Sequence, residues 1–268
     1  MAAMDNLYKG EKGKGLVVFG MLNSSKKVND GQDGFLFKVE IPRLLSLLSY
    51  RRPDAFIPGV EDIVNGGYKP EFDNIPPEEK ERAFSADEKI SRGKTAIGAL
   101  AEYRNAKKAG DTIAANEAYK VFNANFRYFG YGYLNSPESI IPNVPLTFYS
   151  FRAMVGLGFY FMLMFVLVLY FLLNEELDKR RWFLWLAIWT IPLAYIAEQA
   201  GWIVAEVGRQ PWVIQDLLPT TAAVSMIDAT SIQVTFWLFA VIFTALLIAN
   251  IMIMTRQIKL GPNKGGTR

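Results

Sequence analysis

The chain of 268 residues contains no cysteine and no histidine. The absence of cysteine excludes a disulfide framework, thiol catalysis and cysteine-ligated clusters. The absence of histidine excludes Ser-His catalytic triads and most zinc sites, and it removes the commonest haem ligand. The first residues have no basic stretch followed by an apolar core, so they do not form a signal peptide. The net charge of +3 is small and spread over the chain, so the charge predicts no nucleic-acid partner.

Charge and hydrophobicity divide the chain into two unlike parts. Residues 1–147 carry most of the charge, Gly and Pro, whereas residues 148–258 hold long uncharged runs at about 149–174, 181–206 and 231–255. Each run is long enough to cross a bilayer as a helix. The sequence therefore predicts a mainly α membrane protein with three transmembrane helices and an extracytoplasmic α/β loop domain.

The orientation in the membrane follows from the short loops. The connection at residues 174–181 and the tail at residues 259–268 are rich in Lys and Arg, and such loops stay in the cytoplasm. Residues 1–147 and the loop at 206–219 are then expected outside. Both should lie over the same membrane face.

The loop domain is predicted to combine a β-hairpin with short helices. Runs at 15–21 and 34–41 are β-prone and flank a polar turn, which predicts an antiparallel pair. Residues 44–50 predict a short amphipathic helix. Pro and Gly are frequent at 53–77 and 128–145, so we expect a loop and a broken linker there.

Two helices are predicted between these irregular stretches. The string Ser85-Ala86-Asp87-Glu88 is a capping-box pattern, so a helix should begin there and end before Gly110. Asp111 can cap a second amphipathic helix that runs to about Phe126. Together they predict an αα-hairpin.

Four residues of the second apolar run share one helical face. Glu198, Trp202, Glu206 and Arg209 step by four, four and three positions. They fit a helix end with snorkelling charges and an interfacial tryptophan. They also fit a functional pathway, because ionisable groups in spanning helices usually face a bundle interior.

The surrounding string resembles a known family. Gly201-Trp202-x-x-x-Glu206-x-Gly208-Arg209-Gln210-Pro211-Trp212, continued by residues 215–220, is similar to the signature of subunit I of the cytochrome bd quinol oxidases. Residues 16–20, 129–133 and 149–156 add to the resemblance. It covers nearly the whole chain and is thin between residues 53 and 125.

The resemblance implies haem-binding roles for five residues. Met154 would be the axial ligand of a low-spin haem b, and Arg152 would lie beside that haem. Glu206 would serve the iron of a high-spin haem b near haem d, Trp202 would lie among the haems, and Arg209 would pair haem propionates. Without the resemblance, Met154 would be assigned to lipid packing and Arg152 to an interfacial anchor.

Quinol oxidation is implied for two residues of the second β-prone run. In the family a Lys and a Glu of the external loop take part in this step, and Lys38 and Glu40 are the best candidates here. A carboxylate can accept the proton that a quinol hydroxyl loses. By composition alone, both residues fit an edge strand with solvated charges.

The resemblance implies a terminal oxidase of the bacterial plasma membrane. Quinol would give electrons at the outer face, and they would pass through two b haems to haem d, where O₂ becomes water. The family's haem-ligating histidines lie in an amino-terminal half with further spanning helices, and Met1 matches the inside of the quinol loop. We therefore expect a carboxyl-terminal portion of subunit I, inactive without that half and a second subunit. The alternative is a non-catalytic membrane module whose external domain binds a partner or assists assembly.

Overall fold

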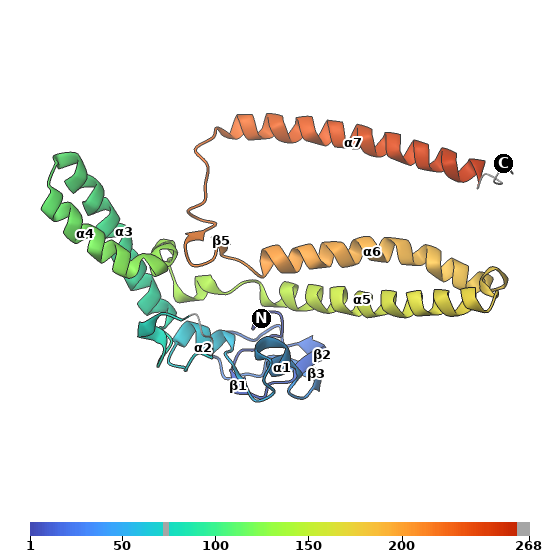
Figure 1. Ribbon diagram of the computed structural model, residues 1–268, viewed down its shortest axis with the longest axis horizontal. Helices are drawn as coiled ribbons and strands as arrows, with labels where there is room; N and C mark the ends of the chain where they lie inside the picture. The colour runs from blue at the N-terminus through green and yellow to red at the C-terminus, as the bar shows by residue number, and fades with distance from the viewer. Residues whose placement is uncertain (72–74, 262–268) are drawn as a thin grey trace. The chain divides into compact units, whose positions relative to one another are not determined.

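The computed structural model describes residues 1–71 and 75–261 of the chain. It separates into two compact units, Met1–Ala223 and Val224–Arg268. Three helices are long and apolar enough to cross a membrane: α5 (Val144–Leu173), α6 (Arg181–Val207) and α7 (Ala229–Leu260) (Figure 1). The predicted class, mainly α with three transmembrane helices and a few short strands, is confirmed.

The part of the first unit before α5, here called the loop domain, is built from short elements. In chain order they are β1 (Glu11–Lys12), β2 (Leu16–Leu22), β3 (Phe35–Ile41), α1 (Leu44–Tyr50), β4 (Phe56–Ile57), α2 (Val60–Asn65), η1 (Pro77–Glu79), α3 (Ala86–Ala109), α4 (Thr112–Asn125), η2 (Phe126–Tyr133) and η3 (Pro137–Ile140). In the rest of the first unit, η4 (Leu177–Lys179) lies between α5 and α6, and β5 (Trp212–Ile214) and β6 (Leu218–Pro219) follow α6.

The predicted β-hairpin is confirmed as the antiparallel pair β2–β3. Residues that face one another across two strands point to the same side of the sheet. The register therefore gives the hairpin two unlike faces. One face holds the pairs Leu16–Ile41, Phe19–Val39 and Met21–Phe37, and the other holds Val17–Glu40 and Gly20–Lys38.

A buried charge cluster holds the β2–β3 connection against α2. The Lys26 side chain is only 2% exposed, and its Nζ lies 2.9 Å from Glu61 Oε1 and also contacts Asp30. The same Glu61 oxygen accepts the Asn29 amide at 2.9 Å, and the ammonium lies over the Tyr8 ring. A buried carboxylate with several donors stays ionised, so this long polar connection has one fixed position.

The loop predicted at 53–77 is wrong in part, because it contains β4, α2 and η1. Residues 72–74 lie outside the described residues. Strand β4 pairs with β1, which the prediction also lacked. Helix α2 starts where the Asp62 carboxylate accepts the Gly59 amide at 2.8 Å. Local signals for such short elements are weak, and their stability comes from tertiary pairing.

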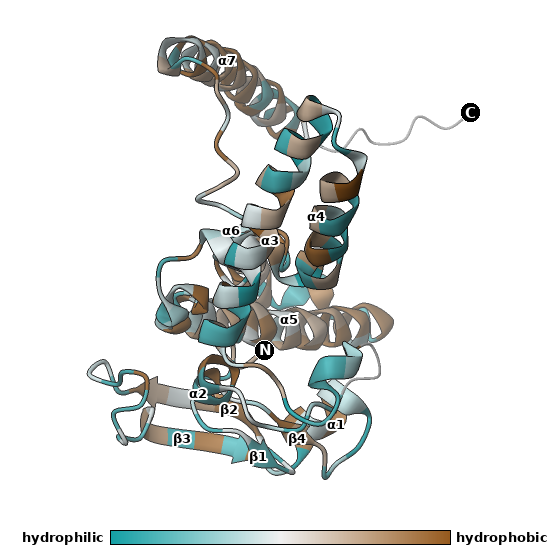
Figure 2. Cartoon of the chain, turned by 90° about the vertical axis from the view of Figure 1, so that its left-hand side faces the viewer, coloured by the Kyte–Doolittle hydropathy of each residue, from teal (hydrophilic) through white to brown (hydrophobic). Residues whose placement is uncertain are grey.

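The αα-hairpin of α3 and α4 is confirmed with its predicted caps. Ser85 Oγ accepts the Glu88 amide while the Glu88 carboxylate accepts the Ser85 amide at 2.7 Å. Gly110 ends α3 in the left-handed conformation, and the Asp111 carboxylate caps α4. Figure 2 shows polar and apolar residues alternating along both helices.

The predicted linker at 128–145 is instead ordered structure, comprising η2, η3 and the start of α5. Tyr128 and Tyr131 of η2 are buried in the main core of the loop domain, with Trp212. Gly93 of α3 and Gly132 of η2 touch closely, since a Cβ on Gly93 would lie 2.3 Å from the Gly132 nitrogen. The glycines that suggest a flexible linker therefore serve close packing.

The helices α5 and α6 pack as an antiparallel pair. Near their connection, Phe171 and Phe183 pack edge to face with ring centres 5.0 Å apart. The hydroxyls of Tyr160 and Thr190 share a hydrogen bond of 2.7 Å. Helix α6 continues through Pro192 as one element.

The second unit contains α7, whose side chains are exposed almost throughout. Its length and apolar composition are those of a membrane span. Most of the tail predicted at 259–268 lies outside the described residues.

Acid is expected to release the β2–β3 connection from α2. Hydrogen bonds from Lys26 and Asn29 outweigh burial and lower the pKa of Glu61, and the pKa of Asp30 falls to about 2 because of Lys26. A carboxyl group whose pKa is lower in the folded chain than in the unfolded chain adds stability at pH values above its unfolded pKa. This stability is lost as the pH falls through its folded pKa. Hydrogen-exchange protection of the Asn29 amide should be constant from about pH 7 to 5 and fall below about pH 4.

Two variants test the origin of this protection. Lys26→Met leaves Glu61 buried without its cation and should lower the free energy of opening at neutral pH by about 3 kcal/mol. Its exposed neighbour variant, Lys27→Met, should change little. Equal protection in both variants would contradict the assignment.

Candidate functional site at the junction of the loop domain and α5

A single arginine near the start of α5 joins this helix to the loop domain. The Arg152 guanidinium contacts the Asp5 carboxylate and the Met4 carbonyl, and it donates to the Val17 carbonyl at 2.8 Å. It also lies over the Phe148 ring, 3.9 Å from the centroid. Arg152 therefore ties the first turn of the chain and β2 to the membrane helix.

The carboxylate partner is deeply buried. Asp5 is 2% exposed in a turn closed by the Leu7 amide bonding to the Ala2 carbonyl, and its Oδ1 accepts the Val17 amide at 3.3 Å. Its Oδ2 has no hydrogen-bond partner in the described part of the chain. Burial raises the pKa of Asp5, although Arg152 opposes the shift. Such a carboxylate has a free acceptor and an increased affinity for a proton.

A cavity of about 360 Å³ lies beside this carboxylate. Its lining includes Asp5, Tyr8, Lys14 and the predicted site residue Lys38. The structure thus brings Lys38 to the same cavity as Asp5. The other predicted residue, Glu40, forms an ion pair of 3.0 Å with Lys38, and both side chains are about one-third exposed, at 35% and 33%. These two charges are solvated and paired on the hairpin.

Met154 lies two residues after Arg152 and faces α6. A Cβ on Gly201 would lie 3.1 Å from the Met154 sulfur, so the glycine leaves room for the thioether. Closer to the loop domain, Gly208 packs in the same way against Thr147. Small residues on α6 therefore allow the helices to approach closely where Met154 lies.

Glu198, Trp202 and Glu206 of the predicted stripe lie on α6, but the helix ends at Val207, so Arg209 lies in the turn that follows. Glu198, Trp202, Glu206 and Arg209 are all exposed, Trp202 at 63%. Within residues 1–71 and 75–261, no ion pair involves Glu198, Glu206 or Arg209. The described residues also contain no group of three His, Cys, Asp or Glu side chains that could hold a metal ion.

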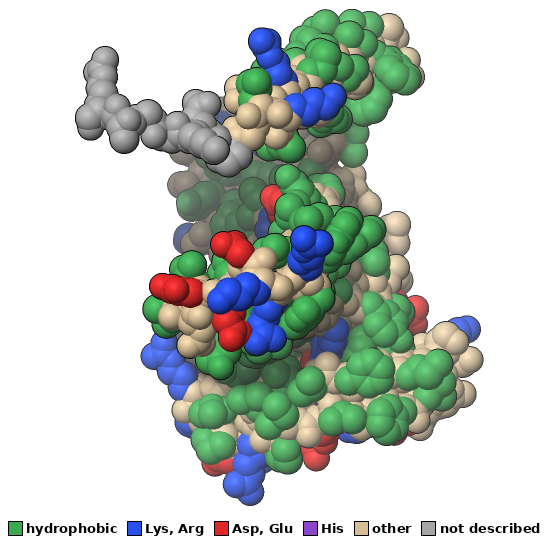
Figure 3. Space-filling model, turned by 90° about the vertical axis from the view of Figure 1, so that its right-hand side faces the viewer, with side chains coloured by type: hydrophobic (Ala, Val, Ile, Leu, Met, Phe, Trp, Pro, Cys, Tyr) green, Lys and Arg blue, Asp and Glu red, His purple; other side chains and the backbone are tan. Residues whose placement is uncertain are grey.

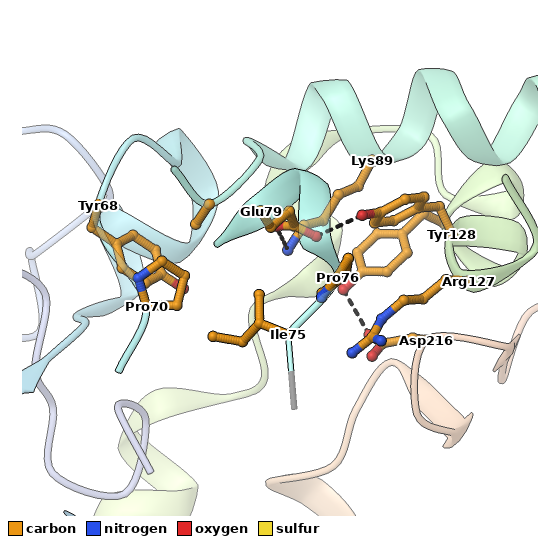
Figure 4. Close-up of a pocket in the computed structure, with 11 residues that line it drawn as sticks. Tyr68, Pro70, Ile75, Pro76, Glu79, Lys89, Arg127, Tyr128 and Asp216 are labelled. Atoms are coloured by element: carbon orange, nitrogen blue, oxygen red, sulfur yellow. Dashed lines mark hydrogen bonds and ion pairs between the residues drawn. The ribbon is translucent and has the colours of Figure 1, made fainter. Parts of the chain in front are cut away.

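A second cavity, of about 530 Å³, lies between η1, η2 and the loop after α6 (Figure 4). Glu79 lies at its centre and accepts the Tyr128 hydroxyl at 2.7 Å and the Phe84 amide at 2.8 Å. Lys89 Nζ lies 3.5 Å from the same carboxylate. Burial raises the pKa of Tyr68 at the rim to about 12. The phenols at this cavity therefore act as protonated hydrogen-bond donors.

Beside the same cavity, the signature loop, residues 208–220, contacts η2. The Tyr131 hydroxyl donates to Asp216 Oδ1 at 2.7 Å, and the Gly130 amide donates to the Asp216 carbonyl at 3.0 Å. The Tyr131 and Trp212 rings lie 4.8 Å apart. The signature loop and the loop domain therefore lie at the same end of the α5–α6 pair, as predicted.

Sequence reasoning missed Asp5, Glu79 and the Tyr131–Asp216 pair. Asp5 and Arg152 are 147 positions apart, and Glu79 and Tyr128 are 49 apart. Neither Asp5 nor Glu79 lies in a distinctive local sequence pattern. Only the position of Asp216 within the recognised string pointed to its importance.

The fold and this junction define an integral membrane protein with a folded domain docked on one end of a helical pair. The chain belongs to the family described as cytochrome bd terminal oxidase subunit I, which matches residues 1–262. It is 30% identical over 233 residues to the cytochrome bd-II ubiquinol oxidase subunit 1 of Escherichia coli (strain K12), covering 87% of this chain and 44% of that protein. It is 35% identical over 122 residues to the cytochrome bd ubiquinol oxidase subunit 1 of Bacillus subtilis (strain 168), covering 45% of this chain and 26% of that protein.

The chain therefore spans less than half the length of these relatives. Its family is that of a haem-containing, membrane-bound oxidoreductase.

Removal of Arg152 is expected to loosen the loop domain from α5. Arg152→Met leaves the buried Asp5 carboxylate without its cation, which should cost about 3–5 kcal/mol. Hydrogen exchange of the Val17 amide should accelerate accordingly. Arg180→Met, which removes the half-exposed ion pair with Glu176 at the other end of the helices, should cost less than about 1 kcal/mol. Equal effects of the two substitutions would contradict the anchoring role of Arg152.

Proposed function

We propose that this chain is the carboxyl-terminal, quinol-oxidising part of subunit I of a cytochrome bd-type oxidase. Together with the amino-terminal half of subunit I and a second subunit, it would transfer electrons from quinol to O₂ and form water. The observation that carries this proposal is the buried Asp5 carboxylate, held by Arg152 two residues from Met154. A proton acceptor and a candidate haem ligand thus lie at one end of α5.

The cavity beside Asp5 would receive the quinol head group. Oxidation of a quinol to a quinone releases two protons and two electrons, so the site needs a proton acceptor. The unpartnered Oδ2 of Asp5 and its raised pKa suit that role. Lys38 lines the same cavity and Glu40 is paired with it, so both remain candidates for binding or for later proton transfer.

The side chains at this end of α5 and α6 are of the kinds that bind haem. The Met154 thioether would be the axial ligand of a low-spin haem b, and Glu206 would serve the iron of a high-spin haem b beside haem d. Arg209 would pair propionates, Trp202 would lie between the haems, and Arg152 would be an electrostatic neighbour. The unpartnered charges at this end of α6 support this, because ionisable groups of a membrane-spanning helix need partners. A bound haem supplies one-electron transfer, and the protein residues position it.

The charge of the short loops supports an orientation in the bacterial plasma membrane. The connection between α5 and α6 and the residues after α7 are basic and would be cytoplasmic. The loop domain and the signature loop would then lie outside, where quinol is oxidised. Membrane lipid, quinol and O₂ complete the set of proposed partners.

Asp5→Asn is expected to slow quinol oxidation in the complete oxidase by about 100-fold, because general-base catalysis typically contributes that much. Electron transfer from a small soluble reductant that bypasses the quinol site should change little. The acidic limb of the pH–rate profile should also disappear, since the titrating carboxyl is gone. Glu117→Gln, an exposed change on α4, is the control. Equal losses with both reductants would contradict a role of Asp5 at the quinol site.

Met154→Leu is expected to lower the midpoint potential of the low-spin haem b or to remove its absorption band. Thioether ligation stabilises the reduced iron, and leucine has no donor atom. Redox titration of the complete oxidase measures this. Met162→Leu replaces a methionine that is 62% exposed on the same helix and should leave the spectrum unchanged. An unchanged spectrum in Met154→Leu would remove the ligand assignment, and a haem-free complex would favour the non-catalytic module.

A further inference from the structure

One face of the β2–β3 hairpin carries only apolar side chains and is exposed. The five side chains with their exposed fractions are Phe19 64%, Met21 59%, Phe37 57%, Val39 49% and Ile41 48%. They form cross-strand pairs and therefore lie on the same side of the sheet. We call this surface the apolar face of the hairpin.

The opposite face of the hairpin is partly covered by the loop domain, although Leu36 on that face is 66% exposed. Val17 is 3% exposed, Gly20 is buried, and Glu40 is half-buried beside Lys38. On the apolar face, Leu16 at one end packs against the core, whereas the five side chains named above are exposed. A contiguous exposed apolar surface of this kind marks an interaction site.

The hairpin rests on the first turns of α5. The Leu22 amide donates to the Tyr149 hydroxyl at 3.2 Å. The Phe35 and Phe148 rings pack edge to face with centroids 5.6 Å apart. The position of the hairpin along the membrane normal is thus set by Phe148 and Tyr149.

Helix α5 is longer than a bilayer requires, which fixes the depth of these contacts. It has 30 residues and ends at Leu173, and the charged connection to α6 follows. About 20 residues cross the hydrocarbon core, so the core begins near Met154. Phe148 and Tyr149 then lie roughly 8 Å outside the hydrocarbon, at the rise of 1.5 Å per residue. That is the depth of the lipid head groups and the upper acyl chains.

Hydrophobic side chains are also exposed on the side of the molecule that looks along the membrane helices. Figure 1 shows α5 and α6 extending from the loop domain toward one side. Figure 3 looks at the molecule from that side and shows hydrophobic side chains spread over its lower part, where Figure 1 places β2 and β3. Hydrophobic side chains are thus exposed on the side of the loop domain toward which α5 and α6 extend.

We propose that the apolar face of the hairpin inserts into the lipid interface of the outer leaflet. The face has no polar side chain, whereas protein interfaces of this size carry several hydrogen bonds. At head-group depth, water still reaches the open strand edges, so the backbone is satisfied there. The hairpin would hold the cavity beside Asp5 at the membrane surface, where an apolar ligand dissolved in lipid can reach it.

Site-directed spin labelling tests this insertion directly, because the chain has no cysteine of its own. Phe37→Cys and Lys38→Cys place labels on opposite faces of β3. The full chain is reconstituted in vesicles of phosphatidylethanolamine and phosphatidylglycerol, and collision rates with O₂ and with a water-soluble nickel chelate are measured. Phe165→Cys on α5, at a position 74% exposed, is the lipid reference, and Ile113→Cys on α4, at a position 77% exposed, is the water reference.

We expect O₂ collisions to exceed nickel collisions severalfold at Phe37, toward the Phe165 value, and the reverse at Lys38 and Ile113. Val39→Cys on the same face repeats the test if Phe37→Cys does not insert. A label at Phe37 that nickel reaches as easily as at Ile113 would overturn the proposal. So would a label shielded from both reagents, because that result means protein covers the face. This outcome does not depend on whether the chain oxidises quinol.

Discussion

The position of the loop domain depends on one buried pair, Asp5 and Arg152. Asp5 belongs to the first turn of the chain, and Arg152 belongs to the membrane helix α5. The same guanidinium holds the carbonyls of Met4 and Val17, so one side chain fixes both the first turn and β2. Buried ion pairs add little net stability but are costly to break, which suits them to fixing a geometry. Here the fixed geometry sets a proton acceptor beside a helix that carries a thioether two residues further on.

The signature string divides into two parts with different physical roles. Trp212 and Asp216 pack and bond to Tyr131, so they hold the signature loop on η2. Glu206 and Arg209 have no such partners in the described chain. A long recognisable string thus combines residues that build the domain end of the helical pair with exposed residues at the end of α6 and just after it. Substitutions of Trp212 or Asp216 are expected to impair folding. Substitutions of Glu206 or Arg209 are expected to impair binding of the group that contacts them.

The sequence predicted the elements that have strong local signals. Apolar length gave the three spans, the Ser85 capping box and Gly110 bounded α3, and alternating β-prone runs gave the hairpin. The prediction failed where tertiary packing determines the local conformation. At 128–145, Gly132 contacts Gly93 and aromatic residues enter the core. The site was predicted in the same uneven way. Lys38 was found near a cavity, but Asp5 was missed because its burial depends on a partner far along the chain.

The open charged stripe of α6 has a consequence for biogenesis. A newly inserted helix with Glu198 facing hydrocarbon is unstable in isolation, because an ionised group there costs several kcal/mol. Under the proposed function, haem and the rest of the oxidase would supply the missing partners. Assembly would then be coupled to membrane insertion, and a copy of the chain without those partners would present a polar defect in the lipid that degradation machinery can recognise.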